Sequence, residues 1–212
     1  MTGPDDFVRH TFGTKYAENE GRLLKRETGP NINTILRTET MTHQTSSAGL
    51  AFPSHVGFSP MQRTDGMAGR NIPQKGNTIT QDGNTFGWSV APADFDIFAR
   101  PTRITRTGSA TRVEKIAYHD NTARWVLGQM EKRTCLSTTT GGTGCTNTAV
   151  AQTTFDPVTA LPLIHAAYGQ VLQTLTWHAD GSLHTSTDGN GHTTTFTDWY
   201  RGVPRHIRHP AT

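Results

Sequence analysis

The ten histidines are the side chains of this 212-residue chain most suited to binding a metal ion. His206 and His209 lie three positions apart, but prolines on both sides favour an extended segment, in which the two would point to opposite faces. His178, His184 and His192 lie near predicted turns and could cluster. Since no acidic residue accompanies them at a fixed spacing, the sequence predicts no metal site and no cofactor.

Carboxylates that could act as an acid and base pair are present, but nothing indicates a cleft. Asp94 with Asp96, and Glu18 with Glu20, have the spacing that a strand places on one face. Capping of turns is the favoured role for all four. The chain also has no Gly-x-Ser-x-Gly elbow, and its glycine-rich stretches 83–87 and 141–144 do not open a helix with a lysine. We therefore expect a protein without catalytic activity.

Two cysteines, Cys135 and Cys145, flank a loop of threonine and glycine. The favoured interpretation is two unconnected small side chains at the base of a hairpin. A disulfide that closes the loop is the main alternative, and a metal site is the least favoured. The state of this pair stays open at the level of sequence.

Four tryptophans, Trp88, Trp125, Trp177 and Trp199, could stack sugars on the face of a sheet. Filling of the space between hairpins is the favoured role, because little other apolar area is available. A shift in tryptophan fluorescence on titration with oligosaccharides would separate the two.

The composition favours many short strands and turns around a thin core. The chain has 37 threonines, 21 glycines and 11 prolines, and threonine prefers pleated, half-exposed surfaces. Strands are predicted at 171–177, 182–187, 193–199 and 205–209. The best helix candidate, residues 158–167, is limited to one turn by its proline. Long loops and the least regular structure are expected at 46–77 and 137–147, the former including residues 61–67.

Several partners and locations are excluded or disfavoured by the same sequence. A formal charge of +3 is too small for a dedicated nucleic-acid groove. No apolar run approaches the length of a membrane span, and the first residues do not form a signal peptide.

A recurring unit, here called the cassette, is the most informative pattern. It has an aromatic residue, usually an acidic residue nearby, then Gly or Ala four or five positions on, followed by Arg, Leu or Pro. The five copies are residues 16–23, 95–102, 155–162, 177–183 and 198–204, and a linking segment at 188–196 joins the last two. The small residue should lie where the chain reverses, and the acid should bond backbone N–H groups in the turn. The predicted repeat residues are Tyr16, Gly21, Arg22, Phe95, Asp96, Arg100, Phe155, Asp156, Trp177, Gly181, Asp188, Gly191, Phe196 and Gly202.

These residues resemble the YD-repeat, or Rhs, family. Its repeat has Tyr-Asp followed by Gly-Arg-Leu, with an Asp-x-x-Gly-Asn-x-Thr-x-aromatic link that corresponds to residues 188–196. Residues 118–129 and 199–204 are similar to the divergent region of that family. The sequence departs from the pattern at Ala160, where glycine is expected, and no core with self-cleaving aspartates is visible.

The resemblance implies an all-β fold, in which stacked antiparallel hairpins over residues 1–212 form a curved strip of a shell. Such shells enclose a toxic C-terminal segment for delivery to competing or host cells. The implied partners are the rest of the parent shell and its toxin, and the implied location is secreted or at the cell surface through a dedicated secretion system. The alternatives are a surface-exposed repeat module that binds carbohydrate or a cell-surface receptor, and a secreted hydrolase that uses Asp96 or Asp156.

Overall fold

The computed structural model describes residues 7–16, 18–45, 47, 49–56, 69–139 and 144–210. The described part contains strands and a single short 3-10 helix, so the predicted all-β class of antiparallel hairpins is confirmed. Fourteen strands pair in chain order as an open sheet, β1-β2-β3-β6 through to β16, and β4 pairs with β5 apart from it. No helix among the described residues is long and apolar enough to cross a membrane.

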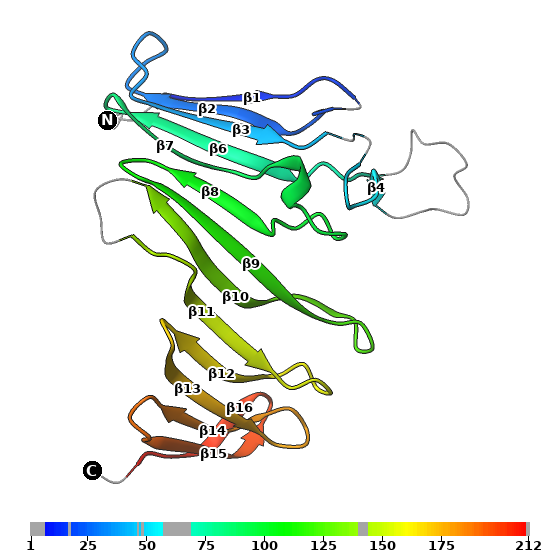
Figure 1. The fold of residues 1–212 in the computed structure, drawn as a ribbon, viewed down its shortest axis with the longest axis vertical. Coiled ribbons are helices and arrows are strands. Elements are labelled where there is room, and N and C mark those ends of the chain that lie inside the picture. The colour runs from blue at the N-terminus through cyan, green and yellow to red at the C-terminus, as the bar shows by residue number, and fades with distance from the viewer. Residues whose placement is uncertain are drawn as a thin grey trace. The chain divides into compact units, whose positions relative to one another are not determined.

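The chain groups into two compact units, residues 1–114 with 138–144 and residues 115–137 with 145–212. The elements that open the chain are β1 (Phe7–Phe12), β2 (Leu23–Gly29), β3 (Arg37–His43), β4 (His55–Val56), β5 (Gly69–Arg70), β6 (Gln74–Gln81), β7 (Asn84–Ser89), the 3-10 helix η2 (Pro92–Asp94) and β8 (Arg103–Thr107). The unit boundary falls within β9 (Thr111–Asn121) and β10 (Val126–Thr139). The second unit then adds β11 (Thr148–Phe155), β12 (Pro162–Ala167), β13 (Gln170–Trp177), β14 (Leu183–Asp188), β15 (Thr193–Tyr200) and β16 (Val203–Arg208), which follow one another as hairpins (Figure 1).

The strands predicted in the C-terminal third are present as β13, β14, β15 and β16. The helix candidate at 158–167 is wrong, because this stretch forms a turn and then strand β12. The loop predicted at 46–77 is partly wrong, since β4, β5 and the start of β6 lie within it and residues 57–68 lie outside the described residues. In the second predicted loop, residues 137–139 are the end of strand β10, and residues 140–143 lie outside the described residues.

Two-residue turns close three hairpins. The turns Asp82-Gly83, Tyr168-Gly169 and Arg201-Gly202 have both central residues at positive φ, between 50° and 79°. This is the mirror-image turn whose twist matches that of paired strands, and it favours glycine at the second position. The sequence therefore sets the register of β6 with β7, β12 with β13 and β15 with β16 locally.

The buried apolar core is small, as the composition predicts. Phe52, Val90 and Phe95 form a cluster in the first unit, with the rings of Phe52 and Phe95 edge to face at 5.6 Å. Among the described residues, eight hydrophobic side chains are buried while seventeen large ones are exposed. Much apolar surface is therefore left uncovered on the sheet.

Candidate functional site

The small residue of all five cassettes adopts the same left-handed backbone conformation. Gly21, Ala99, Ala160, Gly181 and Gly202 have φ angles of 70°, 61°, 61°, 84° and 79°. This left-handed conformation suits glycine, which has no Cβ, whereas Ala99 and Ala160 adopt it at a conformational cost. Gly191 of the linking segment also lies there, with a φ of 87°. The recurrence inferred from sequence is therefore also a recurrence of backbone conformation.

In four of the five cassettes, the aromatic residue pairs with the residue just beyond the turn. Phe95 pairs with Pro101, Phe155 with Pro162, Trp177 with Leu183 and Trp199 with Pro204.

The first cassette differs from this pairing, because it is Phe12 and not Tyr16 that pairs with its leucine, Leu23. Tyr16 is 54% exposed and lies within the turn that leads to Gly21 and Arg22. Tyr16, predicted as the aromatic of the first cassette, is therefore not the aromatic that pairs across its hairpin.

Asp96 and Asp156 close the turns of the second and third cassettes as predicted, whereas Glu18 instead pairs with Lys15. Oδ1 of Asp96 accepts the backbone N–H groups of Phe98 and Arg100 at 2.9 Å each. Oδ1 of Asp156 accepts those of Val158 and Thr159 at 2.9 and 2.7 Å.

The same closure recurs further along the chain. Asp180 accepts the backbone N–H of Ser182, and Asp188 accepts those of Asn190 and His192, all at 2.9 Å. Hydrogen bonds to the ionised form favour it, so these carboxylates are structural acceptors.

These hydrogen bonds lower the pKa of three of the carboxyls. The backbone N–H of Thr159 is the largest cause for Asp156, and the hydroxyl of Ser182 is the largest for Asp180. The pKa of Asp188 is lowered chiefly by the backbone N–H of His192. All three therefore carry negative charge at neutral pH.

The tip of the β9–β10 hairpin docks on the turn of the third cassette. The amide of Asn121 donates to the carbonyl of Pro157 at 2.9 Å, and Nε of Arg124 donates to that of Val158 at 2.6 Å. Nε2 of Gln129 donates to the carbonyl of Ala160 at 3.0 Å. These contacts satisfy three turn carbonyls, and sequence reasoning missed them because it had no means of pairing residues more than thirty positions apart.

Tryptophan indoles bind backbone in the same way in two successive hairpins. Nε1 of Trp177 donates to the carbonyl of Pro162 at 2.7 Å, and Nε1 of Trp199 donates to that of Leu183 at 3.0 Å. Both rings are half-buried, which supports the space-filling role favoured from sequence. Trp125 differs, since its side chain is 75% exposed.

Two buried carboxylates are each held by a pair of basic side chains. Glu27, 5% exposed, lies 2.7 Å from Nε of Arg9 and 2.6 Å from Nζ of Lys25. The hydrogen bond from Arg9 is the largest cause that lowers the pKa of Glu27 to about 2. Glu114 is held in the same manner by Arg106 and Arg112, and its burial is similar. Both carboxylates are fully paired, so neither is available as a general base.

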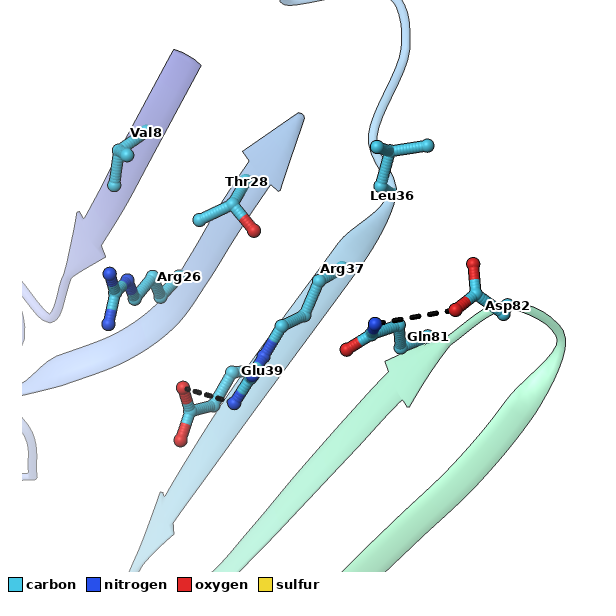
Figure 2. Close-up of a pocket in the computed structure, with 8 residues that line it drawn as sticks. All are labelled: Val8, Arg26, Thr28, Leu36, Arg37, Glu39, Gln81 and Asp82. Carbon is cyan, nitrogen blue, oxygen red and sulfur yellow. Dashed lines mark hydrogen bonds and ion pairs between the residues drawn. The ribbon is translucent and has the colours of Figure 1, made fainter. Parts of the chain in front are cut away.

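A hollow of about 590 Å³ lies over β1, β2, β3 and the end of β6. Figure 2 shows Arg37 beside Glu39, 3.8 Å from its carboxylate, while Arg26 lies on β2 and Asp82 bonds to Gln81 at the end of β6. Two positive and two negative charges cancel, so the hollow does not select for anions.

A second hollow of about 580 Å³ lies between the turns of the third and fourth cassettes. We call it the cassette hollow. Leu161, Leu163 and Trp177 line it together with Asp156, Asp180, Arg124 and His178, among others. It combines an apolar lining with two ionised carboxylates.

Of the three histidines that could cluster, the structure brings together two. The rings of His178 and His184 are 4.4 Å apart between centroids, whereas His192 lies beside Asp188. His206 contacts only the carboxylate of Asp198, at 3.7 Å, among the ion pairs of the described residues. Within the described part of the chain, no group of three or more His, Cys, Asp or Glu converges as a metal site.

The cysteine pair is a disulfide between Cys135 and Cys145, so the favoured interpretation of two unconnected side chains is wrong. Their Cα atoms are 5.8 Å apart, within the range of ordinary disulfides. Cys135 is fully buried. The bond joins Cys145 to strand β10.

Comparison with known proteins adds no family to this description. No family model matches the chain, and no curated protein matches it.

Proposed function

We propose that this chain is a non-catalytic wall segment of an Rhs/YD-repeat toxin shell, which encloses a C-terminal toxin for delivery to competing or host cells. The observation that carries the proposal is the cassette, whose left-handed small residue recurs at five turns between strands that pair in chain order. A sheet of this kind lengthens by adding hairpins, because each hairpin contacts only its neighbours. Such an arrangement suits a wall better than a catalytic centre.

The exposed apolar side chains support a segment that functions within a larger assembly. Val171, Leu172 and Tyr168 are 49%, 55% and 66% exposed around the β12–β13 turn. Exposed apolar patches in soluble proteins commonly mark interaction surfaces. The rest of the parent shell and its cargo are the partners that we propose for them.

The disulfide supports the proposed location. Disulfides persist in oxidising compartments and are rare in the cytosol. The Cys135–Cys145 bond is therefore consistent with export through a dedicated secretion system.

The coding sequence on either side of this reading frame tests the proposal. We expect further in-frame cassettes on at least one side, each with an aromatic, an acid and a glycine or alanine at the spacing found here. A shell core followed by a variable toxin segment should lie downstream. Flanking sequence that encodes neither would contradict the shell proposal.

An edge variant provides a test on the protein itself. Among the described strands, β16 pairs only with β15 and is the last in the sheet order. Pro204 has no N–H, so its nitrogen suits the outer edge, and His206, two residues on, directs its N–H the same way. The backbone N–H of Ile207, the residue after His206, therefore points toward β15.

We expect the wild-type chain to self-associate with rising concentration in sedimentation velocity, because open edges accept further strands. His206→Pro should weaken this association and leave the fold intact. The matched control Ile207→Pro should disrupt the pairing of β16 with β15 as well. Association that is unchanged in folded His206→Pro would remove the edge argument.

A second candidate function, binding of carbohydrate, is favoured by one residue. The 75% exposed side chain of Trp125 offers a ring surface for a sugar. Titration with oligosaccharides should shift the fluorescence of the wild type and not of Trp125→Ala. No shift at millimolar sugar would dismiss this candidate.

A further inference from the structure

The imidazoles of His178 and His184 face each other across the turn of the fourth cassette. His178 follows β13 and His184 lies near the start of β14. Their ring centroids are 4.4 Å apart and their planes are tilted by 44°. Both side chains are half-buried, so the pair is held by its surroundings and is still open to solvent.

The hydrogen bond of His178 determines which of its nitrogens can bind a metal. Nε2 lies 3.2 Å from the carbonyl oxygen of Phe196, on β15. A carbonyl can only accept, so Nε2 carries the proton and Nδ1 of the neutral ring keeps its lone pair. A ring N–H donated to a backbone carbonyl is the usual support of a metal-binding histidine.

His184 also has a nitrogen available. Its Nδ1 lies 3.5 Å from the hydroxyl of Thr176, a contact at the limit of hydrogen bonding. Within the described residues, this contact through Nδ1 is the hydrogen bond found for His184, and it leaves Nε2 unengaged. Two imidazole nitrogens, one from each residue, can therefore serve as ligands.

The distance between the rings fits two ligands on one ion. A metal to nitrogen bond of about 2.1 Å places a ring centroid about 3.2 Å from the ion. Two such rings at about 90° are then about 4.5 Å apart, and at the tetrahedral angle about 5.2 Å. The observed 4.4 Å needs little movement to reach the first arrangement and less than 1 Å to reach the second.

The charge around the pair favours a cation. His178 lines the cassette hollow together with two carboxylates, Asp156 and Asp180, and one guanidinium, Arg124, so these groups leave one net negative charge in its lining. Negative groups at a hollow raise the local concentration of cations. Since no third acidic, histidine or cysteine side chain converges on the pair in the described residues, water would complete the coordination.

We propose that His178 and His184 form a two-imidazole site for a divalent transition-metal ion of the class that prefers nitrogen ligands, namely Zn²⁺, Ni²⁺ or Cu²⁺. The ion would bind across the turn of the fourth cassette, next to the cassette hollow. This inference does not depend on the shell function.

The test is calorimetric titration of the intact chain with NiCl₂ at pH 7.5. We expect one site per chain, with affinity at least tenfold weaker in His184→Gln. The matched control is His192→Gln, whose imidazole lies in the next turn beside a single carboxylate, and its affinity should equal that of the wild type. Unchanged affinity in folded His184→Gln, or loss in His192→Gln, would overturn the site.

A spectroscopic measurement on the wild type keeps the proposal testable if the variant does not fold. Electron paramagnetic resonance of the 1:1 Cu²⁺ complex should show couplings from two nitrogens. A spectrum with one nitrogen, or no binding at millimolar Ni²⁺ and Cu²⁺, would refute the proposal.

Discussion

Loss of the Cys135–Cys145 disulfide should cost a large part of the stability of the second unit. The bond closes a loop with a sequence separation of 10. The chain-entropy relation gives about 9 cal/mol/K for such a loop, or about 2.7 kcal/mol at 25 °C. A typical domain has about 5–15 kcal/mol in total, so the effect should be readily measured.

The assay is urea unfolding followed by tryptophan fluorescence, with and without a phosphine reductant. Intact mass should first show that the oxidised sample lacks two hydrogens. We expect the free energy of unfolding to fall by about 2–3 kcal/mol on reduction. Cys145→Ser is the control, because its unfolding curve should match that of the reduced wild type and should not respond to reductant.

Two results would refute this reasoning. One is coincident curves with and without reductant in a sample whose mass shows the bond. The other is two free thiols after purification under oxidising conditions, which would mean that the Cys135–Cys145 bond does not form.

Three further predictions concern the turn at Gly181, the buried carboxylate of Glu27 and the indole of Trp177. Gly181→Ala should lower the free energy of unfolding by about 0.5–1 kcal/mol, because the left-handed conformation costs about 1–2 kcal/mol and a stiffer unfolded chain offsets part of it. A Cβ there meets nothing within 4 Å, so greater stability in urea would contradict the strain argument. The folded pKa of Glu27, about 2, lies below its ordinary 4.5, so its stabilisation is present above pH 4.5 and is lost as pH falls toward 2. Melting temperatures of Glu27→Gln should fall less steeply over that window, and parallel curves would count against it. Trp177→Phe should cost about 1 kcal/mol through its lost hydrogen bond to backbone, whereas exposed Trp125→Phe should change stability by less than about 0.5 kcal/mol in the same urea assay.

Structural features that depend on a residue and its near neighbours in the chain could be predicted from sequence. The turns at Gly83, Gly181 and Gly202 require positive φ, and the residue types alone indicate it. Capping by Asp96 and Asp156 was predictable for the same reason, because an aspartate reaches N–H groups two to four positions away.

Features that depend on register or on distant pairing could not be predicted. Phe12, and not Tyr16, occupies the aromatic position of the first cassette, because the pairing of β1 with β2 sets the alignment and places a bulge before Phe12. The pairing of the strand start at 74–77 with β3 was missed, because β3 lies more than thirty residues earlier in the chain.

The sequence by itself therefore determined the all-β class, the hairpin turns and the recurrence of the cassette, since each depends on the conformational limits of single residues and their neighbours. Only the tertiary structure decided that Cys135 and Cys145 are bonded, that Arg124 docks on a turn, and that His178 meets His184. Each of these contacts requires a side-chain direction set by the pairing and twist of strands, and such directions are properties of the folded sheet.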